Sequence, residues 1–87
     1  MDNNVLNRVR EIAADVFGAK VEQITPQSSP DSIKNWDSMR HLDFALALEQ
    51  AFSVQFAPEE VEQMLSIELV AMIVEETESR RRPKATP

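Results

Sequence analysis

Apolar residues recur along the chain at helical spacing, and this pattern predicts four helices. Val5, Val9 and Ile12 fall three or four positions apart, which is typical of a helix with one buried side. The predicted helices cover residues 4–17, 37–52, 58–64 and 66–78. The alternation of apolar and polar residues that is typical of strands is almost absent. The sequence therefore predicts an all-α fold, a small four-helix bundle with a long loop between the first two helices.

Residues that favour helix ends agree with three of these helices. Asn3 or Asn4 can cap the first helix, because a side-chain oxygen accepts a backbone N–H that lacks a partner. Gly18 can end it, because glycine tolerates the left-handed turn of a C-terminal cap. Pro58 suits a first helical position, where its missing N–H costs nothing. Ser66 can cap the last helix.

The connection between the first two helices, residues 19–36, is long for a compact helical domain. It contains Pro26 and Pro30 together with several Ser, Asp and Asn residues, and loops of this length are often functional. Short helical turns are expected near residues 21–24 and 31–34. We expect the loop to be pinned to the bundle by four spaced apolar residues, which are Val21, Ile24, Ile33 and Trp36.

Charge is spread unevenly along the chain. Residues 1–79 carry 15 acidic and 5 basic residues, and the tail RRRPKATP adds four basic ones, which gives the net charge of −6. An acidic body disfavours nucleic acid as a partner, because phosphates would be repelled, and it suits proteins that present basic patches. We expect one domain over residues 1–79 and a disordered basic tail over 80–87.

Composition excludes several classes of protein. The chain has no cysteine and a single histidine, His41, so a disulfide framework and a multi-histidine or cysteine-rich metal site are ruled out. The apolar runs are too short to cross a bilayer, and the first residues lack the build of a secretory signal. We expect a cytoplasmic monomer with no metal and no membrane insertion.

The helix predicted over residues 37–52 has more apolar surface than one buried side needs. One side carries Phe44, Ala45, Leu48 and Phe52, and a neighbouring stripe carries Met39, Leu42 and Leu46. Two explanations remain open. Either this helix is central and contacts all three others, or the second stripe is partly exposed and forms a docking face beside Asp43 and Glu49.

Ser38 stands at the N-terminal turn of this helix, and it has three interpretations. It can be a plain helix cap, as can Asn35 and Asp37. It can be a hydrolase nucleophile with His41 as the base, but the chain offers no orienting group and no G-x-S-x-G turn. It can also be an attachment point, because a phosphate linked there would face free N–H groups and the positive end of the helix dipole.

The segment WDSMRHLDFALALEQAF, followed by SVQFAPEEVEQMLSIELVAMI, resembles an acyl carrier protein. The pattern of that family is Asp-Ser-Leu at the start of a helix and Leu-Glu-x-x-Phe one helix length later. Asp37-Ser38-Met39 and Leu48-Glu49-Gln50-Ala51-Phe52 stand at this spacing. The loop VFGAKVEQITPQSSPDSI is also similar to the first loop of the family, and the resemblance covers about residues 4–76.

The resemblance implies that Ser38 carries 4′-phosphopantetheine as a phosphodiester, with Asp37 as its motif neighbour. The thiol of this arm would hold acyl groups as thioesters, and the protein would be a carrier, not an enzyme. Its partners would be a phosphopantetheinyl transferase and the acyl-loading, acyl-transfer or synthase enzymes. The expected docking residues on the helix are Met39, Arg40, Leu42, Asp43, Leu46 and Glu49, and the resemblance places Phe44, Leu48 and Phe52 in the core.

Departures from the family pattern favour a carrier of a specialised fatty-acid, polyketide or lipid pathway. Met39 replaces the usual leucine, Arg40 and His41 stand where acidic or neutral residues are common, and Trp36 recurs in specialised carriers. Arg40 and His41 are therefore expected to influence partner choice. Two alternatives remain, an aminoacyl or peptidyl carrier on the same fold and a non-carrier helical adaptor in which Ser38 is only a cap.

Overall fold

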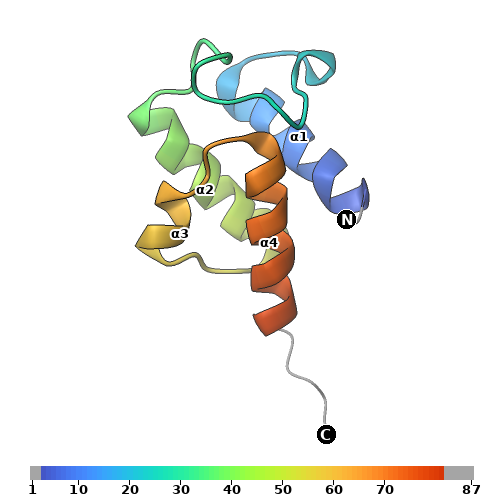
Figure 1. The fold of residues 1–87 in the computed structure, drawn as a ribbon, viewed down its shortest axis with the longest axis vertical. Helices are drawn as coiled ribbons and strands as arrows, with labels where there is room; N and C mark the ends of the chain where they lie inside the picture. The colour runs from blue at the N-terminus through green and yellow to red at the C-terminus, as the bar shows by residue number, and fades with distance from the viewer. Residues whose placement is uncertain (1–2, 82–87) are drawn as a thin grey trace, which may run out of the picture.

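The computed structural model describes residues 3–81 of the chain. This part contains four α-helices and no strand. The elements are α1 (Asn3–Phe17), the short 3-10 turn η1 (Val21–Gln23), α2 (Ser38–Phe52), α3 (Pro58–Glu62) and α4 (Ile67–Arg81). The predicted all-α bundle with a long first loop is confirmed. Figure 1 shows this loop crossing one end of the bundle, from which both α2 and α4 set out.

The helix ends follow the local signals in most places. Gly18 adopts the left-handed conformation (φ 67°) after α1, Pro58 is the first residue of α3, and the Ser66 hydroxyl accepts the backbone N–H of Leu69 at 3.2 Å. α1 begins at Asn3, so neither Asn3 nor Asn4 precedes the helix as a cap. Ser53 ends α2 with a positive φ of 57°, a left-handed C-terminal cap without glycine.

Two helix lengths differ from the prediction. α3 ends at Glu62, two residues earlier than expected. α4 runs to Arg81, so Arg80 and Arg81 of the predicted tail are helical; the rest of that tail, residues 82–87, lies outside the described residues. The longer α4 brings Arg80 within reach of Glu60 of α3, with which it pairs at 2.6 Å, and this long-range contact favours the added helical turn.

The core lies between α1, α2 and α4, with the loop closing one end. Phe17, Trp36 and Phe44 form an aromatic cluster with ring centroids 4.9–5.7 Å apart. The buried apolar residues of this core are Val5, Val9, Ala13, Phe17, Ile24, Ile33, Trp36, Phe44, Leu48, Met64, Ile67, Val70, Ala71, Ile73 and Val74. Phe52, expected in the core, is only partly buried at the end of α2.

The long loop is pinned at several points, as expected. Ile24, Ile33 and Trp36 are buried, and Val21 is half-buried. Loop carbonyls also complete the start of α4, since Ser28 accepts the N–H of Ile67 at 2.9 Å and Pro26 accepts that of Glu68 at 2.8 Å. The second helical turn expected near residues 31–34 is a hydrogen-bonded turn and not a helix.

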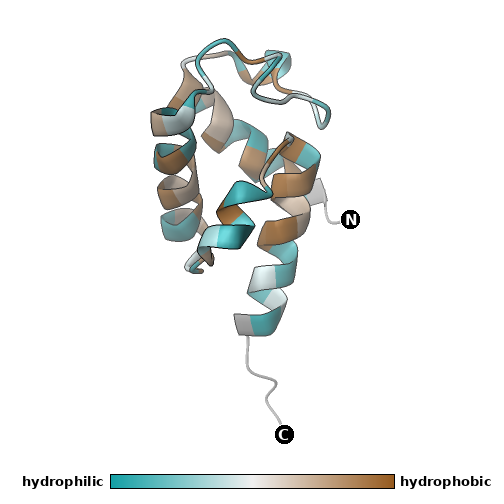
Figure 2. Ribbon diagram, turned by 60° about the vertical axis from the view of Figure 1, so that its left-hand side comes forward, coloured by the Kyte–Doolittle hydropathy of each residue, from teal (hydrophilic) through white to brown (hydrophobic). Residues whose placement is uncertain are grey.

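Polarity differs sharply between the helices. In Figure 2 the ribbon of α2 alternates between hydrophobic and hydrophilic turns, whereas the ribbon of α3 is mostly hydrophilic. No residue of α3 is buried. A helix of five residues has little stability of its own, so α3 depends on its contacts with the other elements.

Candidate functional site

Ser38 is the first residue of α2, and its neighbour Asp37 is the residue that caps the helix. Asp37 has extended backbone geometry, and its Oδ1 accepts the N–H of Arg40 at 2.9 Å. Asn35, another capping candidate, instead donates from Nδ2 to the carbonyl of Phe17 at 2.8 Å. The plain-cap interpretation of Ser38 is therefore wrong, because a neighbouring side chain already fills that role.

The Ser38 side chain is exposed at the end of the bundle that the loop crosses. Within residues 3–81 its hydroxyl has no hydrogen-bond partner. α2 is 15 residues long, so its N-terminus carries the partial positive charge of the helix dipole. A phosphate linked to this hydroxyl would lie next to that charge and in water, where a large modifying enzyme can reach it.

An open pocket of about 610 Å³ lies beside Ser38, between α2 and α3. One wall comes from the first turns of α2 and the residues before it, and the other from α3 and the residues that follow it. The lining residues are Pro30, Trp36, Asp37, Ser38, His41, Leu42, Val61, Glu62, Met64 and Leu65. Most of them are apolar, so the hydroxyl stands at the edge of an apolar hollow.

His41 lies in this pocket with both ring nitrogens engaged. The Trp36 indole Nε1–H donates to His41 Nδ1 at 2.8 Å, and His41 Nε2 lies 2.8 Å from the carbonyl oxygen of Val61. The side chain is half-buried. Any influence of His41 on partner choice would have to coexist with these two bonds. Both ring nitrogens are bonded to groups other than the Ser38 hydroxyl, so the contact that the hydrolase interpretation needs is not formed.

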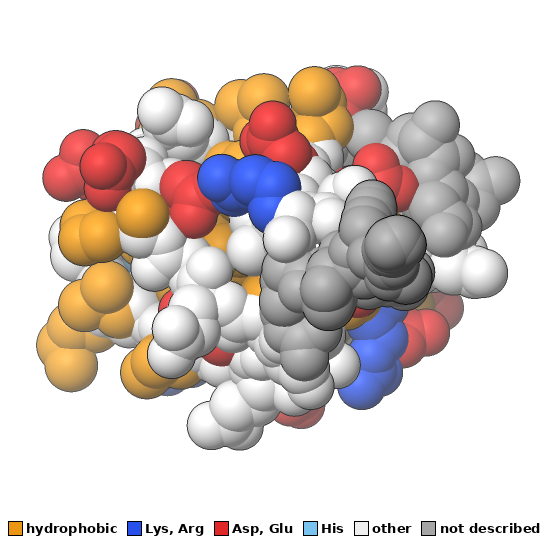
Figure 3. Space-filling model, turned by 90° about the horizontal axis from the view of Figure 1, so that it is seen from below, with side chains coloured by type: hydrophobic (Ala, Val, Ile, Leu, Met, Phe, Trp, Pro, Cys, Tyr) orange, Lys and Arg blue, Asp and Glu red, His pale blue; other side chains and the backbone are white. Residues whose placement is uncertain are grey.

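The apolar stripe predicted to face partners is exposed. Met39 is 78%, Leu42 58% and Leu46 56% exposed, and Asp43 is exposed beside them. α2 does contact all three other helices, because it packs against α1 and α4 and its His41 bonds to Val61 of α3. These contacts leave the Met39, Leu42 and Leu46 stripe exposed, as the second explanation expects. Figure 3 shows apolar side chains at the surface along two edges of the molecule, with acidic side chains among them.

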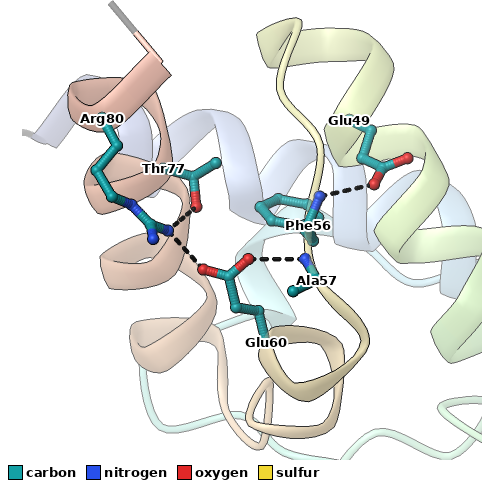
Figure 4. Close-up of polar contacts among 6 residues, drawn as sticks. All are labelled: Glu49, Phe56, Ala57, Glu60, Thr77 and Arg80. Carbon is teal, nitrogen blue, oxygen red and sulfur yellow. Dashed lines mark hydrogen bonds and ion pairs between the residues drawn. The ribbon is translucent and has the colours of Figure 1, made fainter.

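Arg40 and Glu49, two of the predicted docking residues, make contacts within the fold. Arg40 Nη1 donates to the carbonyl of Val16 at 2.7 Å, where a cation also suits the negative end of the α1 dipole. Glu49 Oε2 accepts the N–H of Phe56 at 2.9 Å and so fixes the connection that follows α2 (Figure 4). Any docking role of these two residues would have to coexist with these contacts.

Sequence reasoning missed a polar cluster that anchors α3 to α4 (Figure 4). Glu60 accepts the N–H of Ala57 at 2.8 Å and pairs with Arg80 at 2.6 Å. The bond from Ala57 and the contact with Arg80 lower the pKa of Glu60, against a smaller opposing effect of burial. Only the spacing of Ala57 and Glu60, which is that of a helix start, was visible in the sequence.

The described residues form neither a metal-ligand cluster nor a membrane-spanning helix. Among residues 3–81 no three His, Cys, Asp or Glu side chains come together as a set of metal ligands. No helix in the same range is long and apolar enough to cross a membrane.

The comparisons with known proteins agree with this geometry. Residues 7–74 match the family described as "Phosphopantetheine attachment site". A protein named acyl carrier protein from Rubrobacter xylanophilus is 30% identical over 64 residues, which cover 74% of this chain and 79% of that protein. Another protein of that name, from Coprothermobacter proteolyticus, is 30% identical over 71 residues, which cover 82% of this chain and 87% of that protein. The chain belongs to the acyl carrier protein family.

A solved structure extends the likeness to the whole fold. The solution structure of a holo acyl carrier protein from Geobacter metallireducens superposes with a TM-score of 0.81 and 23% identity, over 95% of each chain. At this identity the likeness concerns the fold alone. It agrees with the four helices and the long first loop that the pattern of apolar residues predicts.

Proposed function

We propose that this chain carries acyl groups on a 4′-phosphopantetheine arm linked to the Ser38 oxygen as a phosphodiester. One observation carries the proposal. The Ser38 hydroxyl is exposed at the N-terminus of α2, while Asp37 does the capping. A serine with no capping role, in a chain of the phosphopantetheine attachment family, is best explained as the attachment point.

The residues around Ser38 suit a bound arm. The first turn of α2 supplies N–H groups and a positive dipole end next to the phosphate, and the pocket between α2 and α3 offers apolar walls beside it. The arm would supply a thiol that holds acyl groups as thioesters. The chain itself would bind, present and release this cargo without catalysing a step.

The exposed stripe of Met39, Leu42 and Leu46, with Asp43 at its edge, is the proposed docking face. Residues 42–79 contain nine acidic residues and no Lys, Arg or His, the acidic ones being Asp43, Glu49, Glu59, Glu60, Glu62, Glu68, Glu75, Glu76 and Glu78. Partners with basic residues around an apolar hollow would match such a surface. These partners would be a phosphopantetheinyl transferase and the enzymes that load and receive the acyl group.

The proposed setting is a specialised fatty-acid, polyketide or lipid pathway, with the protein acting as a cytoplasmic monomer. The support for a specialised pathway is the chemical character of the residues that follow Ser38. Met39 and Arg40 follow the serine where the family pattern has leucine and then acidic or neutral residues. Enzymes adapted to that usual pattern would meet a different surface here.

Intact mass measurement tests the proposal. The protein is incubated with coenzyme A and a broad-specificity phosphopantetheinyl transferase, and a sample without transferase is the control. We expect one added phosphopantetheine per chain in the complete reaction and none in the control. An unchanged mass, with a known carrier modified in parallel, would overturn the carrier and leave a helical adaptor in which Ser38 carries no group.

A further inference from the structure

The two hydrogen bonds of His41 define its protonation state. An indole N–H only donates, so His41 Nδ1 must accept and carries no proton. A carbonyl oxygen only accepts, so Nε2 must carry the proton that it shares with Val61. The ring is therefore neutral, in the Nε2–H form. The planes of the His41 and Trp36 rings are nearly parallel, with centroids 6.0 Å apart and an interplanar angle of 20°.

These bonds join a rigid part of the molecule to a weakly held one. Trp36 is buried and packs against Phe17 and Phe44, so the indole is a fixed anchor in the core. Val61 belongs to α3, which has five residues and none of them buried. The His41 ring connects the two.

α3 has one polar tether near each end. Near its N-terminus, Glu60 binds the N–H of Ala57 and pairs with Arg80 of α4. Near its C-terminus, the carbonyl of Val61 binds His41 of α2. Met64, three residues after Val61, is fully buried, and its packing adds to the second attachment. Loss of the His41 bond should therefore loosen the C-terminal end of α3 and leave its other end in place.

We infer that His41 is a positioning residue that holds the C-terminal end of α3 against α2 and so sets the width of the pocket beside Ser38. His41 lines that pocket from α2, while Val61, Met64 and Leu65 line it from the opposite wall. The consequence for cargo rests on the proposed function, because a group attached to Ser38 would meet this wall first. The mechanical role of His41 does not depend on it.

The tautomer of the ring can be tested in the unmodified protein. ¹⁵N chemical shifts of the His41 ring, measured in mildly alkaline buffer, should show a proton on Nε2 and none on Nδ1. The variant Trp36→Phe removes the indole donor and should weaken this preference. A wild-type ring with its proton on Nδ1 would overturn the inference, and this result does not require any variant to fold.

Amide hydrogen exchange tests the positioning itself. The amides of Gln63 and Met64 bond to carbonyls of Glu60 and Val61, so they report on the end of α3. His41→Leu should speed their exchange by about fivefold, the effect of one net hydrogen bond. His41→Gln, which keeps a donor and an acceptor, should restore much of the protection. Amides in the middle of α1 and α4 are the internal reference.

A matched variant separates the two tethers. Arg80→Gln breaks the contact near the N-terminus of α3 and should affect Glu60 and Val61 more than Met64. Equal exchange at Gln63 and Met64 in wild type and His41→Leu would overturn the inference. Because no arm is present in these measurements, a protein that shows the predicted exchange but gains no mass with transferase would overturn the proposed function alone.

Discussion

The two sides of α2 have similar apolar residues and very different surroundings. Phe44 and Leu48 have no exposed surface, whereas Leu42 and Leu46 are more than half exposed. Each side would lower the free energy of the protein if it were covered. Only the first side is covered by the protein itself, and the second is the face that we propose a partner covers.

This difference assigns separate roles to the two sides of α2, one in packing and the other in the proposed docking. The buried side fixes α2 against α1 and α4, so the N-terminus of α2 and its Ser38 are held in place. In the proposed docking, the exposed side would present a partner with a surface whose position relative to Ser38 is fixed. Stability and docking are therefore separable by mutation along the same helix.

The largest expected effect is on the stability of the buried side. Leu48→Ala should lower the free energy of unfolding by about 2–5 kcal/mol, because it leaves a cavity in the core. Leu46→Ala removes the same atoms from an exposed position and should cost less than about 0.5 kcal/mol. Urea unfolding of the two variants makes the comparison. Similar losses at both positions would show that the second side is ordinary core.

The next effect concerns docking on the exposed side. Leu46→Ala should slow transfer of phosphopantetheine to the protein by about tenfold at limiting protein concentration, as for an apolar contact at an interface centre. Gln50→Ala, on the same helix and also exposed, is the control and should behave as wild type. If the rate of the Leu46 variant matches that of the control, docking must occur elsewhere on the surface.

A smaller effect separates the cap from the attachment point. Asp37→Ala removes the side chain that accepts the Arg40 N–H and should cost about 1 kcal/mol of stability. Asp37→Asn keeps an acceptor and should cost much less. Thermal unfolding checks both variants. If only Asp37→Ala slows arm transfer, the slowing comes from the cap; if Asp37→Asn slows it equally, the carboxylate has a role toward the partner.

The smallest effect lies at the contact of α3 with α4 and depends on pH. The folded pKa of Glu60 is below its ordinary value of 4.5, so the ionised form is favoured in the folded protein. Its contribution to stability is complete above that ordinary value and is lost as the pH falls through the lowered folded pKa.

The variant Glu60→Gln tests this pH dependence. It should be less stable than wild type at neutral pH by on the order of 0.5–1 kcal/mol, since the partner Arg80 is largely exposed. The difference should disappear in acid. Glu59→Gln, which removes the same charge from the same helix, is the control. A stability difference between Glu60→Gln and wild type that persists unchanged in acid would contradict the account of Glu60.

The fold was predictable because its signals are local. Apolar spacing within each helix, Gly18, Pro58 and Ser66 all act on residues within a few positions. The apolar excess of α2 was also visible, but its two explanations differ only in what packs against the helix. That choice depends on the arrangement of α1 and α4, which spacing alone does not give.

The unpredicted features all involve distant or competing partners. Arg40 binds Val16 and His41 lies against Val61, 24 and 20 positions away, so neither contact leaves a pattern in its own segment. The extension of α4 likewise places Arg80 beside Glu60, 20 positions away in the sequence. Asn35, Asp37 and Ser38 are all good caps, and the choice among them depends on where the loop backbone becomes helical.

The most direct test of the account compares two serine variants by mass. Ser38→Ala and Ser79→Ala each remove one exposed hydroxyl, and Ser38→Ala leaves the cap at Asp37 intact. Both are treated with coenzyme A and the transferase after circular dichroism has shown that they are folded. The account predicts one added phosphopantetheine on Ser79→Ala, as on wild type, and none on Ser38→Ala. A folded Ser38→Ala protein that gains the same mass as wild type would contradict it.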